Sequence, residues 1–282
     1  MAGPAADVIR QFAAVEHDQR YSRLAELFTP DAIYYDPFKG PQRGDDAIAS
    51  FLAEMEVIIP RLGVRFEDRE VHGDTTCGWS RWRMIARGDD EAEHSIHGQS
   101  IYRLRDGKVC FVADYVDPVA YGRLRPTGPR PDNGAAAGLS ATLSTGSDGT
   151  NGEGGAALAL LRRFWEIQSA ARYRDLAPLF ADDAVFTDLI YGRMEGIGEI
   201  SAYLERMEAE MPGMGVYFEL VDAAGDDTVG WSQWNAVFPT GTVPGWSLHT
   251  VRDGRFTLDS DYFDTVRARE VQSGRPPVAD IT

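Results

Sequence analysis

Two short stretches of the sequence place an aspartate among apolar residues in a pattern that could move protons. Asp114 is the first Asp of DYVD in RDGKVCFVADYVD, and Asp261 is the first Asp of DYFD in RDGRFTLDSDYFD. Alternate residues of a strand share a face, so Val112 and Val116 would surround the Asp114 carboxyl with apolar groups. Burial there raises the pKa of a carboxyl toward the range in which it exchanges protons near neutral pH. We therefore predict Asp114 and Asp261 as catalytic residues.

A second pair of aspartates follows an aromatic residue on what reads as a short strand. Asp36 comes two residues after Tyr34, and Asp188 comes two residues after Phe186. In a strand this spacing places each aromatic ring and its carboxyl on one face, so both aspartates are predicted catalytic residues. For Asp36 a second interpretation stays open, because an Asp directly before Pro37 often starts a turn by accepting hydrogen bonds from nearby backbone.

The same features occur in both halves because the chain contains an internal duplication. At an offset of 152 residues Tyr21 falls on Tyr173, and GWSRW falls on GWSQW. This period is far longer than a solenoid unit, and the chain is long enough for two independent cores. A segment rich in Gly, Ser, Ala and Pro separates the copies, and we expect it to be a flexible linker that lets them pair face to face. The predicted divisions are a first domain at 1–124, the linker at 125–155, a second domain at 156–272 and a tail at 273–282.

Each copy has the element order of an α+β domain. Apolar residues recur at helical spacing near residues 8–15, 21–28 and 48–55, and the strand-like segments follow. The predicted fold is therefore two tandem cone-shaped domains, each a curved, mostly antiparallel sheet wrapped by about three helices. Such a cone leaves an apolar pocket open at one end. Asp117 and Asp264, at the ends of the last strands, are predicted to cap whatever follows.

Several of these motifs together resemble a known family. LAELFTPDAIYYDP, two spaced glycines, AIASFL, DGK and DYVD are similar to the SnoaL-like branch of the nuclear transport factor 2-like superfamily, and the resemblance covers nearly all of each copy. It implies the cone fold. The superfamily includes ketosteroid isomerases, scytalone dehydratase-like enzymes, polyketide cyclases, limonene epoxide hydrolase, the epoxide hydrolases that close polyether rings and members without known catalysis. The fold therefore does not select one reaction.

Similarity to limonene epoxide hydrolase implies roles for some of these residues. The Tyr-x-Asp of the first copy resembles its Tyr-x-Asn, and the first Asp of DYVD and DYFD matches its general base. That enzyme also needs an Arg-x-Asp on the neighbouring strand. In this register the chain has Arg81-x-Arg83 in one copy and Gln233-x-Asn235 in the other. A guanidinium cannot donate a proton at neutral pH, so the acid of that mechanism is missing from both copies.

The polyether-forming epoxide hydrolases imply a different acid. Glu67 in GVRFED and Glu219 in GVYFEL resemble the Glu that partners an Asp in those enzymes. Asp36 with Glu67, and Asp188 with Glu219, would then be carboxyl pairs whose pKa values are separated by their surroundings. The protonated member would act on the epoxide oxygen and the ionised one on the attacking hydroxyl. The alternative is that each Glu is simply solvated on a half-exposed strand.

Aromatic and polar residues near these strands are the candidates for substrate contacts. In GWSRW and GWSQW the two tryptophans are three residues apart, so they lie on opposite faces of a strand. One of each pair is expected to pack under the helices, and the other to line the pocket mouth or the contact between copies. The predicted substrate-binding residues are Tyr34, Trp79, Arg81, Arg83, His97, Phe186, Trp231, Gln233, Asn235 and Trp246.

Composition excludes several classes of protein. The net charge of −16 disfavours binding to a nucleic-acid backbone. The histidines lack the spacing and carboxylate company of a metal site, and no motif for a cofactor is present, so neither is expected. No apolar run reaches transmembrane length and no signal peptide is evident, which predicts a cytoplasmic protein without a membrane partner. Cys77 and Cys110 are expected to be buried thiols, with a disulfide between them disfavoured.

The sequence leaves three functions open. The leading hypothesis is a cofactor-free acid/base enzyme that opens an epoxide in a small hydrophobic polyketide, terpenoid or steroid-like metabolite. The first alternative is an isomerase, dehydratase or aldol-type cyclase that works through an enolate, because one Asp in an apolar cone can abstract a proton next to a carbonyl. The second is a ligand-binding or dimerisation module without catalysis.

Overall fold

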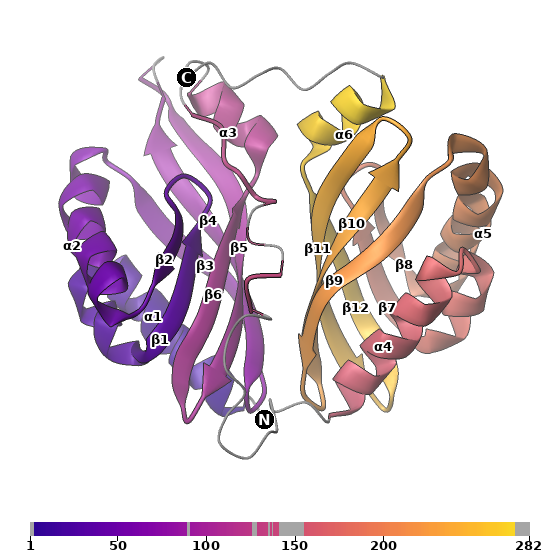
Figure 1. The fold of residues 1–282 in the computed structure, drawn as a ribbon, viewed down its shortest axis with the longest axis horizontal. Coiled ribbons are helices and arrows are strands. Elements are labelled where there is room, and N and C mark those ends of the chain that lie inside the picture. Colours follow the sequence, from indigo (N-terminus) through magenta and orange to yellow (C-terminus); the bar gives the residue numbers. More distant parts are fainter. Residues whose placement is uncertain are drawn as a thin grey trace. The chain divides into compact units, whose positions relative to one another are not determined.

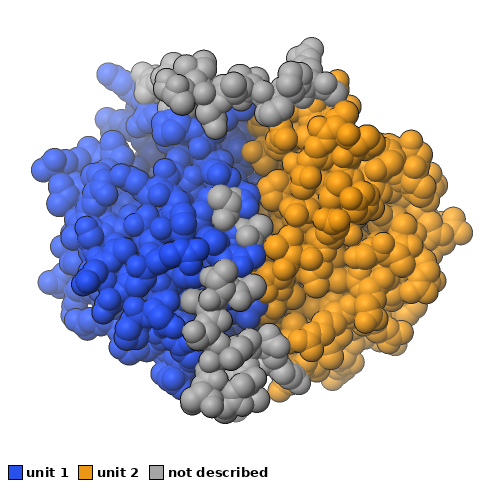
Figure 2. All heavy atoms as spheres, viewed as in Figure 1, with its two compact units in different colours: residues 1–153 blue, residues 154–282 orange. Residues whose placement is uncertain are grey.

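The computed structural model describes residues 3–88, 91–125, 129–134, 136, 138–140 and 155–273. The chain divides into two compact units, residues 1–153 and 154–282, which are coloured separately in Figure 2. Each unit is a six-stranded sheet with helices against it. The predicted α+β class and the tandem arrangement are therefore confirmed.

The first unit forms one mixed sheet from six strands. Strand order is β2-β1-β6-β5-β4-β3, with β1 and β6 parallel and the other neighbours antiparallel. In chain order the elements are α1 (Pro4–His17), the 3-10 helix η1 (Tyr21–Leu27), β1 (Phe28–Asp36), β2 (Gly40–Arg43), α2 (Asp45–Arg61), β3 (Arg65–Gly73), β4 (Cys77–Arg87), β5 (Glu93–Arg105), β6 (Lys108–Val116) and α3 (Pro118–Leu124).

The second unit repeats this topology with strand order β8-β7-β12-β11-β10-β9, and here β7 and β12 are the parallel pair. Its elements are α4 (Ala156–Ser169), η3 (Tyr173–Leu179), β7 (Phe180–Asp188), β8 (Gly192–Glu195), α5 (Gly196–Met214), β9 (Tyr217–Gly225), β10 (Val229–Phe238), β11 (Gly241–Arg252), β12 (Arg255–Phe263) and α6 (Thr265–Gln272).

In each unit the long helices lie along one face of the sheet (Figure 1). Ile9 and Phe12 of α1 are buried, and they recur at the spacing that places them on one side of a helix. Phe12 makes edge contacts with Phe28 and with Tyr34 of β1. This buried layer between helices and sheet is the core, and it also fixes which face of each strand points inward.

The strand ends behave as their turn and capping residues predict. The β5–β6 hairpin turns at Asp106-Gly107, whose φ angles are +53° and +74°, a conformation that glycine adopts without strain. Asp117 accepts hydrogen bonds from the backbone N–H groups of Val119 and Ala120 at 2.9 and 3.1 Å, so it caps α3. Asp264 caps α6 in the same way, which confirms the predicted capping role.

Part of the predicted linker is bound to the first unit. The Asn133 side chain accepts from the Val116 backbone N–H at 3.1 Å and donates to the Val116 carbonyl at 2.9 Å. The Asp132 N–H donates to the Pro37 carbonyl at 2.7 Å. The amide of Asn133 thus continues the pairing of a strand end, and the flexibility of the linker stays a prediction. Residues 141–154 of the linker, and the tail after Ser273, lie outside the described residues.

The two cysteines are free and buried, as expected, and burial raises the pKa of the Cys110 thiol to about 11. Among the described residues, no helix combines the length and the apolar character needed to cross a membrane. The face-to-face pairing of the two domains stays a prediction.

Candidate active site

The first unit encloses a cavity of about 250 Å³ between α2 and the inner face of the sheet. Its wall is mostly apolar, with Met55, Phe66 and Met84 among the contributors. Asp36 and Asp114 also line it, as does the Tyr34 ring. Two carboxyl groups, those of Asp36 and Asp114, therefore lie in the wall of one apolar cavity.

The Asp114 carboxyl is held by two hydroxyl donors. The Tyr34 Oη donates to its Oδ2 at 3.0 Å, and the Ser100 Oγ donates to its Oδ1 at 2.6 Å. Ser100 in turn accepts from the Trp82 indole Nε1 at 2.9 Å. These residues come from β1, β4, β5 and β6, so the sheet itself assembles the chain of hydrogen bonds.

A glycine on the neighbouring strand makes room for that indole. A side chain at Gly98 would meet the Trp82 ring at 2.1 Å, too close for any real contact. Gly98 is paired directly with Trp82 across β4 and β5, so the ring lies over the glycine and reaches Ser100. Gly245 performs the same task beneath Trp234 in the second unit.

Burial is the main cause of the altered acidity of Asp114. It raises the pKa of this carboxyl to about 7, and the negative charge of Asp36 pushes in the same direction. The hydrogen bonds from Ser100 and Tyr34 favour the ionised form and partly offset that rise. Asp114 therefore exchanges its proton close to neutral pH, as a general base or acid requires.

Asp36 combines the two interpretations open at the sequence level. Its Oδ1 accepts from the backbone N–H groups of Phe38 and Lys39 at 2.9 and 2.8 Å, which is the turn predicted for an Asp before proline. The same side chain lines the cavity, and burial raises its pKa. It is a turn residue that also presents a carboxyl to the hollow.

The second unit repeats the arrangement in a smaller cavity of about 70 Å³. The Trp234 Nε1 donates to the Ser247 Oγ at 2.7 Å, and Ser247 donates to Asp261 Oδ1 at 2.5 Å. Phe186 stands where the first unit has Tyr34, so the second hydroxyl donor is absent. Burial, with the charge of Asp188 in support, raises the pKa of Asp261 to about 8.

Asp188 lines this second cavity too. Its Oδ1 accepts from the backbone N–H groups of Ile190 and Tyr191 at 2.6 and 2.8 Å. Its Oδ2 accepts from the Tyr203 hydroxyl at 3.5 Å, and burial raises its pKa. The second unit therefore also brings two predicted carboxyls into one hollow.

Comparison with known proteins identifies the family. The model of the SnoaL-like domain matches residues 9–112 and again residues 161–258, together more than half of the chain. The chain belongs to the SnoaL-like family. Each compact unit holds one SnoaL-like domain.

Three similar solved structures each match less than half of the chain. An NTF2-like protein of unknown function from Mesorhizobium loti is 20% identical, with 40% of this chain and 90% of that chain covered and a TM-score of 0.35. A putative ketosteroid isomerase from Kribbella flavida is 20% identical over 37% of this chain and 75% of that one, with a TM-score of 0.33. TerC, co-crystallised with polyporic acid, is 20% identical, with 43% of this chain and 98% of that chain covered and a TM-score of 0.37. No curated protein matched.

Several predicted site residues of the first SnoaL-like domain lie on the other face of the sheet. Strand β4 turns Trp82 and Met84 toward the cavity, so the odd-numbered residues between Trp79 and Arg83 point away from it. Trp79 stacks on His72 with ring centroids 4.3 Å apart, and Arg81 binds Glu70 at 2.8 Å. The predicted substrate contacts of Trp79, Arg81 and Arg83 are therefore not formed in this cavity.

The glutamates proposed as acid partners are also outside the cavities. Glu67 forms an ion pair with Arg83 and does not line the hollow that holds Asp36. Glu219 is exposed and pairs across the sheet with Asn235. The structure thus does not bring either Glu together with its predicted Asp, because each follows the inward residue, Phe66 or Phe218, by one position.

Other predicted substrate contacts also lie outside the cavities. His97 is exposed and sits opposite Arg83 in the β4–β5 register. In the second domain β10 directs Trp234 and Ala236 into the cavity, so its odd-numbered predicted residues face away. The residues absent from the wall of the second cavity are Trp231, Gln233, Asn235 and Trp246.

Sequence reasoning missed the partners that hold the catalytic candidates. Ser100 and Ser247 carry the hydrogen bond to the carboxyl, and Trp82 and Trp234 hold those serines. A usable signal was present, since all these residue types recur at matching positions in both copies. Among the described residues, no cluster of three or more His, Cys, Asp or Glu side chains is placed to hold a metal ion.

Proposed function

We propose that the first SnoaL-like domain catalyses cofactor-free proton transfer on a small, hydrophobic metabolite, as an isomerase that works through an enolate. One observation carries the proposal: Asp114 lies in the wall of an apolar cavity of about 250 Å³, and its pKa is about 7. A base with this pKa is about half ionised at pH 7 and mostly ionised at pH 8, yet basic enough to take a proton from carbon.

The reaction needs only residues of this wall. The Asp114 carboxylate takes a proton from the carbon next to a ketone. The electron pair of that C–H bond forms a carbon–carbon double bond, and the carbonyl electrons move onto oxygen. Asp114 then returns the proton to another carbon of the conjugated system, which completes an isomerisation without change of oxidation state.

Epoxide opening is the second candidate, because two carboxyls line the same cavity. Asp114 in its protonated form would donate to the epoxide oxygen, while Asp36, whose negative charge helps to raise the pKa of Asp114, takes a proton from the attacking water or hydroxyl. This version does not use Glu67, which the structure places on the other face of the sheet.

The test uses a small β,γ-unsaturated ketone, cyclohex-3-enone, followed by NMR in D₂O. The full chain should convert it to cyclohex-2-enone, with kcat/KM rising as pH increases through about 7 because Asp114 must be ionised. Asp114→Asn should lose about 100-fold or more of this activity. Glu67→Gln, a matched carboxyl-to-amide change outside the cavity, should keep it.

Other outcomes separate the alternatives. Hydrolysis of cyclohexene oxide to a diol that carries one oxygen-18 atom from labelled water, lost in Asp114→Asn, would favour epoxide opening over enolate chemistry. Binding of either probe without turnover, unchanged by Asp114→Asn, would reject both enzymatic proposals and leave a ligand-binding domain.

A further inference from the structure

The two cavities differ in the charge of their walls. Around the first cavity stand Glu16, Lys39 and Arg125 in addition to its two aspartates. At the equivalent positions the second cavity has Gln168, Tyr191 and Gln272. Apart from Asp188 and Asp261, the described residues that line the second cavity are uncharged. Duplication has therefore produced a second cavity that suits a neutral ligand better than an anion.

The surroundings of Asp261 favour its carboxylic-acid form. Among the residues that the structure describes, Ser247 is the one hydrogen-bond partner of this carboxyl, whereas Asp114 has two. On the same face of β12, Asp259 replaces Val112 of the first domain and places another carboxyl two residues away. One donor fewer and one more acid both disfavour a negative charge on Asp261.

Among the described residues around Asp261, no cation offsets this effect. Asp261 interacts with Asp188 of β7, Asp259 of β12 and Tyr203 of α5, and all three are acids. His249 of β11 places its Nδ1 3.4 Å from Asp259 and its Nε2 3.2 Å from the Ser232 hydroxyl. Burial lowers the pKa of His249 to about 3, so its ring stays neutral at physiological pH.

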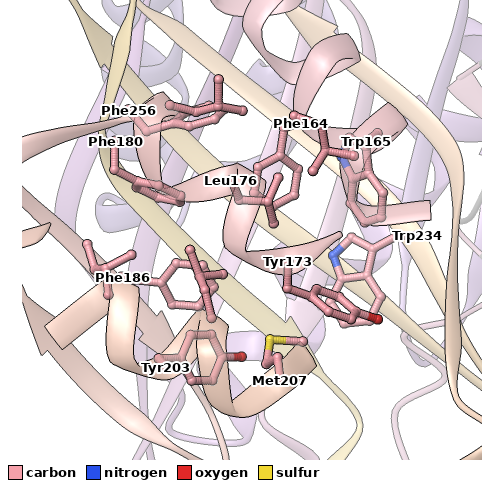
Figure 3. Packing of buried hydrophobic residues seen from close by; sticks show 14 of the residues in the cluster. Phe164, Trp165, Tyr173, Leu176, Phe180, Phe186, Tyr203, Met207, Trp234 and Phe256 are labelled. Carbon is pink, nitrogen blue, oxygen red and sulfur yellow. The ribbon is translucent and has the colours of Figure 1, made fainter. Parts of the chain in front are cut away.

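The remaining wall is aromatic and adaptable. Trp165 and Trp234 lie close together, and Tyr203 and Met207 point into the same packed region (Figure 3). Met207, Met211 and Met214 line the cavity from α5. A hollow of about 70 Å³ is smaller than the engineered cavity of about 150 Å³ that admits benzene, so even one ring requires these unbranched side chains to move.

We propose that the second domain is a binding site for an uncharged ligand built on a single small ring, whose oxygen accepts a hydrogen bond from the carboxylic-acid form of Asp261. The second domain is then not another copy of the proton-transfer site. The proposal stands whether or not the first domain is catalytic, because it depends only on the wall of the second cavity.

Fluorine NMR of the full chain with 4′-fluoroacetophenone tests the proposal. This ketone is neutral and offers one accepting oxygen. Because the pKa of Asp261 is about 8, the affinity for this ketone should be constant below about pH 7. It should fall about tenfold for each pH unit above 8, as Asp261 loses its proton. Asp261→Asn keeps an N–H donor at any pH, so its affinity should not vary between pH 6 and 9.5.

Three controls assign the signal to the second cavity. Ala236→Met introduces the residue that the first domain has at that position, Met84, and should abolish the Asp261-dependent binding by filling the hollow. Asp114→Asn should leave the pH dependence near 8 intact. 4-Fluorobenzoate, an anion of similar size, should bind at least tenfold more weakly at pH 7.

Specific results would overturn the inference. Binding of the ketone that does not weaken above pH 8, or that weakens above pH 8 equally in Asp261→Asn, would show that the acid form of Asp261 is not the donor. Equal binding of 4-fluorobenzoate would show that the cavity does not select against negative charge. Loss of cyclohexenone turnover in Asp114→Asn bears only on the first domain, so the two proposals fail separately.

Discussion

Replacing Tyr34 with Phe should raise the pKa of Asp114 and leave the cavity otherwise unchanged. The Tyr34 hydroxyl donates to Asp114 Oδ2 at 3.0 Å and stabilises the ionised carboxyl. A hydrogen bond to a charged group contributes about 1.5–3 kcal/mol, and about 1.4 kcal/mol corresponds to one pKa unit. The pKa of Asp114, about 7 in the native protein, should therefore rise by about one to two in Tyr34→Phe.

The second domain supplies the reciprocal experiment. Phe186 occupies the position of Tyr34, so Phe186→Tyr should add the missing donor and lower the pKa of Asp261 from about 8 by a similar amount. Carboxyl carbon-13 NMR of aspartate-labelled protein measures both titrations, with Asp114→Asn and Asp261→Asn to assign the resonances. In the first domain, the pH at which kcat/KM is half-maximal should move with the titration of Asp114.

An unchanged or lowered pKa of Asp114 in Tyr34→Phe would refute this reasoning, provided that the variant keeps its thermal stability. It would mean that the hydroxyl does not favour the ionised carboxyl in solution. A rise in the first domain without a fall in Phe186→Tyr would confine the conclusion to the first cavity.

Three further predictions concern stability. Ser100→Ala removes the acceptor of the buried Trp82 indole as well as a donor to Asp114, and should lower the free energy of unfolding by about 1–3 kcal/mol in urea titrations; no loss would contradict the role of this hydrogen bond. Asp114→Asn should stabilise the protein at pH 8 but not at pH 4. The pKa of Asp114 is about 7 in the folded state and about 4 in the unfolded state, so the wild type loses stability as pH rises from 4 to 7. A difference in Tm between Asp114→Asn and the wild type that stays constant from pH 4 to pH 8 would contradict this prediction. Asp259→Val and His249→Tyr introduce the residues that the first domain has at these positions. Together they should lower the free energy of unfolding by about 0.5–3 kcal/mol less than the sum of the two single changes, because each single change already breaks the buried contact between Asp259 and His249. Additive effects would rule out coupling between the two residues.

Much of the fold was predictable because its signals are local or repeated. The duplication, the α+β order and the capping role of Asp117 follow from spacing and residue type along the chain. So does the apolar environment of Asp114, which rests on Val112 and Val116 two positions away on the same face. The turn made by Asp36 was likewise encoded by the proline after it.

Other features of the site depended on contacts between distant segments. Ser100 and Trp82 become partners only because β4 and β5 pair in the register that sets Trp82 against Gly98. The tie between Asn133 and Val116 joins a segment rich in linker-type residues to a strand end. Composition predicts low packing in such a segment, and it cannot reveal one well-placed amide.

By itself the sequence determined that two SnoaL-like cones follow one another and that an aspartate of the last strand in each would lie among apolar residues. It also established that Trp79, Arg81 and Arg83 share one face and Trp82 the other. Only the tertiary structure decided which of those faces the helices cover, and hence that Trp82 belongs to the cavity wall while Arg83 and Glu67 pair outside it. The reason is that alternation along a strand is a property of the local backbone, whereas the choice of the buried face is made by helices and strands far away in the chain.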